Sequence, residues 1–291
     1  MAPAPWFGRK AKAARRTARQ SVDALPDGLW TKCPTCGEIL FNKELQKNLR
    51  VCNKCGYHYK LTAVERLGML ADDGTFVEMD ANLRSSDPLG FPDYQSQLAK
   101  FEERSQLADA IVTGTCEIGG IPAIIGVMDF VFWGGSMGGA VGEKVVRAME
   151  KALESKLPVV MVIASGGIRV NEGLSGLMQM AKTSAACAKL HQAKLPYIVV
   201  LTDPSMAGVL ASYGSLGDFI IAEPGLLTGL TADRVAAQAQ VIHYPDDFRR
   251  AEFALEHGQI DRIASRREIK STLVKLLHFC RAQEETQDDA A

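Results

Sequence analysis

The chain has 291 residues, of which 47% are hydrophobic and 23% charged, and its formal net charge is −1 at pH 7. This size and composition suit one large α/β domain with a small additional module, and the near-neutral charge argues against nucleic acid as the main partner. No run reaches the roughly eighteen apolar residues that span a bilayer, and the N-terminus lacks the apolar core of a signal peptide. We therefore expect a cytoplasmic protein.

Residues 1–28 are basic, and we expect them to form a disordered, solvated tail. Six lysines and arginines lie between positions 9 and 19, with no acidic residue before Asp23. This pattern leaves contact with nucleic acid, an acidic partner or an import receptor open. At the other end, residues 276–291 are expected to form a second loose tail.

Residues 29–61 contain four cysteines in two C-x2-C pairs that are fifteen residues apart. They are Cys33, Cys36, Cys52 and Cys55. Glycines 37 and 56 follow the pairs and give each turn the backbone freedom to face both sulfurs toward one ion. The pattern predicts a structural zinc ribbon, with iron as the alternative metal, because a four-thiolate site has no open position for substrate. The other three cysteines lack such a pattern and are expected to be core residues of a reducing compartment.

Residues 62–72 have helical apolar spacing, with Thr62 and Glu65 placed to form a capping box. A second, polar helix is expected over 94–105. Two β-rich runs, 110–118 and 121–131, are joined by two glycines and predict a hairpin. Thereafter helices over 142–155, 172–192 and 208–216 alternate with apolar strands over 159–164, 197–202 and 219–222. This alternation indicates an α/β fold with a mainly parallel sheet.

Three glycine-rich stretches each join a predicted strand to a predicted helix. They are Gly134–Gly139, Ser165–Gly173 and Asp203–Val209. Amides at the start of a helix lack intrahelical partners and lie at the positive end of its dipole, so they stabilise an oxygen that gains negative charge. Each such donor is worth about 3–4 kcal/mol in a transition state. Tight packing is the alternative for a single loop, but three loops in succession favour chemistry.

The motifs of other enzyme classes are missing. The loops contain neither the G-x-G-x-x-G motif nor a P-loop motif, and the chain has no G-x-S-x-G elbow. The five histidines are scattered along the sequence, and none lies beside a plausible nucleophile. An ordinary doubly wound nucleotide fold and serine hydrolysis are therefore both disfavoured. The pattern favours an enolate held by backbone amides, with the base supplied by a substrate or cofactor.

In their order and amino-acid sequence, these motifs resemble one family, the β subunits of the acetyl-CoA carboxylase carboxyltransferase of bacteria and plastids. The resemblance covers about residues 28–275 and is carried by CPTCGEILFNKEL, GGSMGGAVGEKVVRAME, ASGGIRVNEGLSGLMQMAKTSAA, LTDPSMAGVLASYGSLGD and FALEHGQID. It implies that residues 62–275 adopt a crotonase/ClpP-like fold, a spiral of ββα units, behind the zinc ribbon. It also implies an α2β2 heterotetramer that is active only with its α subunit.

The activity implied by the resemblance is transfer of a carboxyl group from carboxybiotin, on a separate biotin carrier protein, to acetyl-CoA. The product is malonyl-CoA, in the first committed step of fatty acid synthesis. Carried over residue by residue, the amide donors are Gly166, Gly167, Ala207 and Gly208. The residues implied to contact coenzyme A are Gly134, Gly135, Ser136, Gly138, Arg169 and Arg234, although arginines beside glycine loops more often pair with local carboxylates.

This sequence departs from the family pattern at three positions. Ile168 follows Gly166 and Gly167 where the family has alanine, Ala207 replaces a glycine, and Asp233 interrupts the segment that usually reads GFAGPR. An alanine still donates its N–H if its φ is negative. At Ile168 and Asp233, two alternatives stay open: a narrower pocket and a pocket with a changed charge.

Two alternatives to this function stay open from the sequence. One is a carboxyltransferase-like paralogue, or a self-sufficient acyl-CoA hydrolase or isomerase, with a changed acyl preference. The other is a regulatory protein that binds nucleic acid through its ribbon and basic tail.

Overall fold

The structure is a computed structural model that describes residues 29–230, 245 and 247–288. The chain divides into two compact units, with the boundary between Tyr57 and His58. We describe each unit by itself. The basic N-terminal segment predicted to be a tail lies outside the described residues.

The first unit is a small ribbon with little apolar core. Its antiparallel strands β1 (Trp30–Lys32) and β2 (Ile39–Phe41) precede helix α1 (Asn42–Lys47). Its buried hydrophobic side chains among the described residues are Cys33, Leu40, Leu45 and Cys52. Since only two of these four are ordinary core residues, this unit needs a further source of stability.

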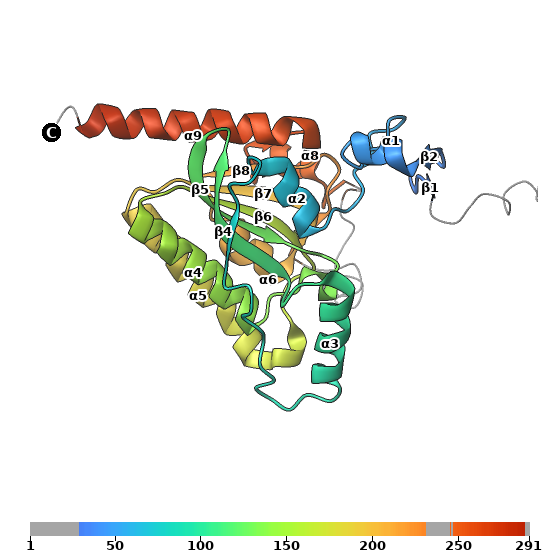
Figure 1. Cartoon of the computed structure of the whole chain (residues 1–291), viewed down its shortest axis with the longest axis horizontal. Coiled ribbons are helices and arrows are strands. Elements are labelled where there is room, and N and C mark those ends of the chain that lie inside the picture. Colours follow the sequence, from blue (N-terminus) through green and yellow to red (C-terminus); the bar gives the residue numbers. More distant parts are fainter. Residues whose placement is uncertain (1–28, 231–244, 246, 289–291) are drawn as a thin grey trace, which may run out of the picture. The chain divides into compact units, whose positions relative to one another are not determined.

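The second unit is built on an eight-stranded sheet in the order β10-β8-β7-β6-β5-β4-β3, with β9 paired to β7 (Figure 1). Strands β3, β4 and β5 are antiparallel, and β5, β6, β7, β8 and β10 are parallel. The strand bounds are β3 Val77–Met79, β4 Ile111–Ile118, β5 Ile121–Met128, β6 Val159–Ser165, β7 Tyr197–Met206, β8 Phe219–Ala222, β9 Thr228–Gly229 and β10 Arg262–Ile263. The mainly parallel pairing that was predicted is confirmed, and so is the hairpin, in which Ile118 pairs with Ile121.

Helices cover both faces of this sheet. The helix bounds are α2 Ala63–Leu70, α3 Tyr94–Ser105, α4 Gly139–Ser155, α5 Gly173–Gln192, α6 Ala207–Val209, α8 Ala251–Glu256 and α9 Arg266–Asp288. Short 3-10 turns precede α4 and α5, at Trp133–Gly135 and Val170–Glu172, and a π-helical turn follows α6 at Leu210–Gly214. Figure 1 shows α4 and α5 side by side, with α9 running along the opposite side of the sheet.

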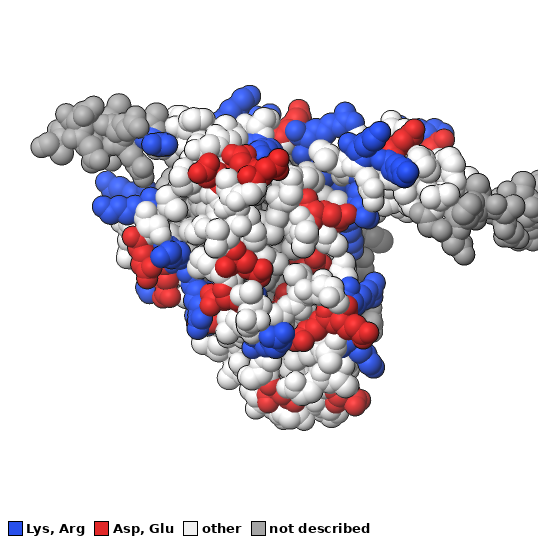
Figure 2. All heavy atoms as spheres, viewed as in Figure 1, with Lys and Arg blue, Asp and Glu red and all other residues white. Residues whose placement is uncertain are grey.

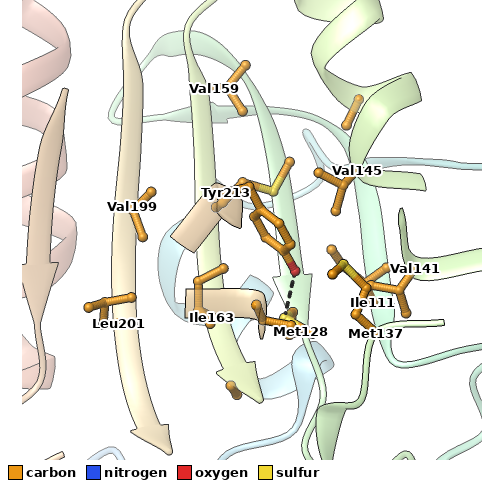
Figure 3. Packing of buried hydrophobic residues seen from close by; sticks show 14 of the residues in the cluster. Ile111, Met128, Met137, Val141, Val145, Val159, Ile163, Val199, Leu201 and Tyr213 are labelled. Carbon is orange, nitrogen blue, oxygen red and sulfur yellow. Dashed lines mark hydrogen bonds between the residues drawn. The ribbon is translucent and has the colours of Figure 1, made fainter. Parts of the chain in front are cut away.

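Alternating side chains of the central strands divide the core into two clusters. One face, which includes Met161 and Val199, packs with α4 and α5, and the other, which includes Val160 and Val200, packs with α2 and α9. In the first cluster the hydroxyl of Tyr213 donates to Met128 Sδ at 3.0 Å (Figure 3). Burial on both faces explains why these strands have continuous apolar sequences.

Local sequence signals set several element boundaries. The predicted capping box is present, because Thr62 accepts the Glu65 amide while the Glu65 carboxylate accepts the Thr62 amide. Helix α3 and strand β8 have the predicted limits. The helix predicted over 208–216 is instead the short α6 followed by the π-helical turn.

The prediction of a loose C-terminal tail from residue 276 is wrong. Helix α9 continues to Asp288, and Leu273 and Leu277 are buried in the second core cluster. Their spacing of four residues places both on one face of the helix, against the sheet. The acidic composition of the last residues hid this apolar face.

A buried ion cluster joins three separate elements of the second unit. Glu223, which follows β8, accepts hydrogen bonds from Arg66 on α2 at 2.9 and 3.2 Å and from Arg266 on α9 at 2.8 and 2.9 Å. All three side chains are at most 4% exposed. Burial by itself raises the pKa of Glu223, but the two guanidinium groups outweigh it and lower that pKa to about 2.

Positive and negative side chains are interspersed on the face of the described residues seen in Figure 2. Among the helices of the described part, none is long and apolar enough to cross a membrane.

Candidate functional site

The four ribbon cysteines form a cluster with the geometry of a metal centre. Their sulfur atoms all lie within 4.8 Å of one another, with Cys33 and Cys55 at 3.6 Å and Cys36 and Cys52 at 3.8 Å. A tetrahedral zinc ion with Zn–S bonds of about 2.3 Å requires sulfur separations of about 3.8 Å. The donor set therefore fits a closed, structural four-thiolate zinc site.

In the second unit, three segments lie at or after the ends of sheet strands. We call Trp133–Gly138 the first loop. The second loop, Ser165–Glu172, begins at the last residue of β6, and the third loop, Asp203–Gly208, comprises the end of β7 and the start of α6. Backbone hydrogen bonds fasten the second loop to the first: Gly166 N–H donates to Gly134 O at 2.9 Å, and Met137 N–H donates to Gly167 O at 2.8 Å. The predicted residues of these two loops are therefore brought together.

Gly135 shows how closely the first loop approaches the sheet. Its φ is +64°, and a Cβ there would lie 1.9 Å from the carbonyl oxygen of Ala164 on β6. No other residue fits without moving the backbone. Gly135 therefore serves the close packing of loop and strand.

The second and third loops also meet. Gly167 has a φ of +122°, and a Cβ on it would lie 2.7 Å from Ala207 Cβ and 3.6 Å from Gly208 N. A Cβ on Gly208 would in turn lie 2.5 Å from Ile168 Cγ1. The predicted donors of these loops are thus neighbours, at one junction.

A buried ionic cluster contacts both the first and the second loop. Arg169, which is 1% exposed, bonds Asp109 with both terminal nitrogens, at 3.0 and 2.5 Å, and bonds Ser136 Oγ with Nε at 3.1 Å. The ion pair with Asp109 outweighs the effect of burial and raises the pKa of Arg169 above its usual range. Glu172 accepts the Tyr94 hydroxyl at 2.5 Å and the Gly139 amide at 2.6 Å. This cluster ties both loops to α3 and α4.

These contacts correct three predicted substrate residues. Arg169 is enclosed by Asp109 and Glu172, so it is not available for coenzyme A phosphates. Ser136 is 8% exposed and faces Arg169, and a Cβ on Gly138 would lie 2.1 Å from Glu172 Oε1. Sequence reasoning missed Asp109, and its only signal was a carboxylate directly before an apolar strand.

The amides of Gly166 and Gly167 are already in use, which corrects their prediction as free donors. Gly166 donates to Gly134, as described above, and Gly167 donates to Ser165 Oγ at 3.0 Å. Within the described residues, the amides of Ile168 and Gly208 donate no hydrogen bond. Gly208 lies in the first turn of α6, where amides have no intrahelical acceptor. The unused amides therefore lie at the junction of the second and third loops.

Two further predicted residues, Ala207 and Arg234, differ from the others. Ala207 has a φ of +52°, so the negative φ on which its prediction as a donor depended is absent. A left-handed conformation at a residue other than glycine costs about 1 kcal/mol or more. Arg234, like Asp233, lies outside the described residues.

Within the described residues, no histidine or cysteine lies in these three loops, and their two carboxylates are engaged elsewhere: Glu172 as described above, and Asp203 by the Leu227 amide at 2.9 Å. The described histidines lie elsewhere: His58 accepts the Arg266 amide, and the others are at His191 near the end of α5, His257 after α8 and His278 in α9. Cys116 and Cys187 are buried, and burial raises the pKa of each thiol to about 12. The junction therefore offers backbone donors without an acid–base side chain.

Ser165 fastens the first two loops, which leads to a stability prediction. Its buried hydroxyl donates to Gly135 O at 2.5 Å and accepts the Gly167 amide. We expect Ser165→Ala to lower the free energy of unfolding by about 1–3 kcal/mol, because two buried polar groups lose their partner. Urea unfolding checks this, with the exposed Ser175→Ala as the matched control. Equal stability of both variants contradicts it.

Comparison with known protein families gives two matches along the chain. Residues 58–241 match the carboxyl transferase domain, and residues 30–55 match the acetyl-CoA carboxylase zinc finger domain. The two matched regions meet close to the boundary between the two compact units.

Comparison with individual proteins gives the same result as the family matches. The chain is 52% identical to the acetyl-coenzyme A carboxylase carboxyl transferase subunit beta of Desulforamulus reducens, over 87% of this chain and 88% of the relative. It is 47% identical to a protein of Natranaerobius thermophilus named for subunits beta/alpha, over 87% of this chain and 42% of that one. Among solved structures, transcarboxylase 12S, with methylmalonyl-coenzyme A and methylmalonic acid bound, matches with a TM-score of 0.65 and 29% identity, over 75% of this chain and 40% of that chain.

Proposed function

The chain belongs to the family of β subunits of the acetyl-CoA carboxylase carboxyltransferase, and from this we propose that it transfers the carboxyl group of carboxybiotin to acetyl-CoA, forming malonyl-CoA. The biotin is supplied on a separate carrier protein. The reacting groups meet at the junction of the second and third loops. The observation that carries this placement is the pair of unused amides, of Ile168 and Gly208, beside a helix start.

These amides suit the charge that develops in the reaction. When the thioester methyl loses a proton, negative charge moves to the thioester oxygen, and preorganised N–H donors stabilise it by about 3–4 kcal/mol each. We assign the Gly208 and Ile168 amides to this role, with Ala207 beside them. In the first loop, the carbonyl groups of Gly134 and Gly135 accept hydrogen bonds from the second loop and hold it in place.

The base for this step need not come from the protein. Cleavage of the N–CO2 bond of carboxybiotin releases CO2 and leaves a ureido nitrogen that accepts the methyl proton, after which the new carbon–carbon bond forms. This chemistry is compatible with loops that have no histidine and whose carboxylates, Glu172 and Asp203, are hydrogen-bonded to other parts of the chain. The closed zinc site takes no part in it and stabilises the ribbon.

An exposed apolar patch beside the second loop gives a docking surface for the α subunit. It comprises Val170, Leu174, Leu177 and Met178, which are 80%, 69%, 51% and 53% exposed. Residues 174, 177 and 178 share one helical face at the start of α5, and Val170 lies in the 3-10 turn that precedes this helix. Apolar side chains gathered in this way mark a protein interface. The Natranaerobius relative, which carries both subunit names on one chain, supports the α subunit as the occupant.

We expect Leu174→Asp to weaken α-subunit binding by at least about 30-fold, since a buried charge in an interface centre costs 2 kcal/mol or more. Calorimetric titration with the α subunit measures this, and light scattering tests the proposed α2β2 stoichiometry. Val64→Asp, at a position that is 68% exposed on α2, is the matched control. Unchanged affinity of the Leu174 variant contradicts this docking surface.

The function is tested by malonyl-CoA formation from acetyl-CoA and carboxylated biotin carrier. The assay compares this chain alone, the α subunit alone and the mixture. We expect activity only in the mixture. Activity of this chain alone refutes the shared assembly, and a stable but inactive mixture refutes the proposed reaction.

A further inference from the structure

The side chain of Ile168 occupies the junction between the second and third loops. Its Cγ1 and Cδ1 lie 2.5 and 2.6 Å from where a Cβ on Gly208 would be, and its Cγ2 lies 3.3 Å from the corresponding position on Gly176 of α5. Met180 Sδ also borders Gly208, at 2.9 Å from the same position. Ile168 therefore fills the space that two glycines leave open.

This side chain differs from an ordinary core residue in its surroundings. It is only partly buried, at the edge of the first core cluster. The unused amide of Ile168 and that of Gly208 lie beside it. A thioester oxygen held by these amides brings the acyl carbons within a few ångströms of the Ile168 side chain. Branching at Cβ also restricts the rotamers by which isoleucine moves aside.

We infer that Ile168 is a specificity-determining residue that narrows the acyl site, so that this chain excludes acyl groups longer than acetyl more strongly than family members with alanine at this position. This inference rests on the proposed function and names its substrate limit. A longer acyl chain extends from the methyl carbon into the space that Ile168 occupies. One methylene that does not fit such a pocket changes kcat/KM by about 10–200-fold.

The experiment measures kcat/KM of the complex with the α subunit for acetyl-, propionyl- and butyryl-CoA. We expect Ile168→Ala to raise the propionyl/acetyl ratio by at least about 10-fold, and Ile168→Val to raise it less. Ile263→Ala is the matched control, because Ile263 is also partly buried against the same cluster but lies on β10. We expect the control to leave the ratio unchanged.

Binding of acetyl-, propionyl- and butyryl-CoA in the absence of carboxybiotin gives the same selectivity without turnover, and these thioesters keep the oxygen that the amides hold. If acetyl-CoA is not carboxylated, the proposed function fails, while the binding ratio still tests Ile168. A propionyl/acetyl ratio, in turnover or in binding, that stays constant across wild type, Ile168→Val and Ile168→Ala overturns the inference. A ratio that rises equally in the Ile263 variant overturns it too, because a general loosening of the core then explains the change.

Discussion

Replacement of Cys52 by serine is expected to unfold the ribbon between Trp30 and Tyr57 while the second unit stays folded. The ribbon buries only Leu40 and Leu45 besides two of its cysteines. Zinc binding to such a module contributes about 10–16 kcal/mol at pH 7, and loss of one thiolate removes most of it.

Metal analysis and limited proteolysis check this prediction. Wild type is expected to carry one equivalent of metal, identified as zinc or iron, and Cys52→Ser or a chelator is expected to expose the ribbon to protease. Cys280→Ser, outside the cluster, is the control and is expected to keep the metal. Protection of the metal-free ribbon would show that its fold does not depend on the ion.

Glu223→Gln is expected to lower the free energy of unfolding of the second unit by about 3–5 kcal/mol at pH 7. The substitution leaves Arg66 and Arg266 buried beside each other without their shared carboxylate. Denaturant unfolding measures the loss. Glu102→Gln is the control, because Glu102 forms an ion pair with a half-exposed Arg84 and such pairs contribute at most about 1 kcal/mol.

The same carboxylate gives a pH dependence with a definite sign. The pKa of Glu223 is about 2 in the folded chain and near its ordinary value of 4.5 when unfolded. A lowered folded pKa means that the stabilisation is complete above pH 4.5 and is lost as the pH falls toward 2. The stability difference between wild type and Glu223→Gln should therefore narrow by about 3 kcal/mol across this window. A difference that is constant from pH 5 to 3 contradicts the role of this ionised group.

Several features of the fold follow from short-range signals. The capping box at Thr62 and Glu65 and the two-glycine hairpin are formed by residues that are near each other in sequence. The apolar runs of β6 and β7 predict buried parallel strands because both of their faces are covered. The spacing of the four cysteines is also a short-range signal, because each C-x2-C pair spans a single tight turn. This spacing predicts the observed cluster.

The candidate site was only partly predictable. The sequence indicates which loops precede helices, but which amides are free depends on contacts between loops. The Gly166 amide donates to Gly134 O, and the Gly167 amide donates to Ser165 Oγ, so neither amide is free. Arg169 resembles a surface arginine in the sequence, and its burial depends on Asp109, which is 60 positions away.

By itself, the sequence determined the α/β class, the metal ligands and the three glycine-rich loops, because helix periodicity, turn chemistry and ligand spacing act within a few residues. Only the tertiary structure decided that Arg169 is buried and that Ile168 fills the space at Gly208. These outcomes depend on packing and charge pairing between segments far apart in the chain, and such contacts leave no periodic trace in the sequence.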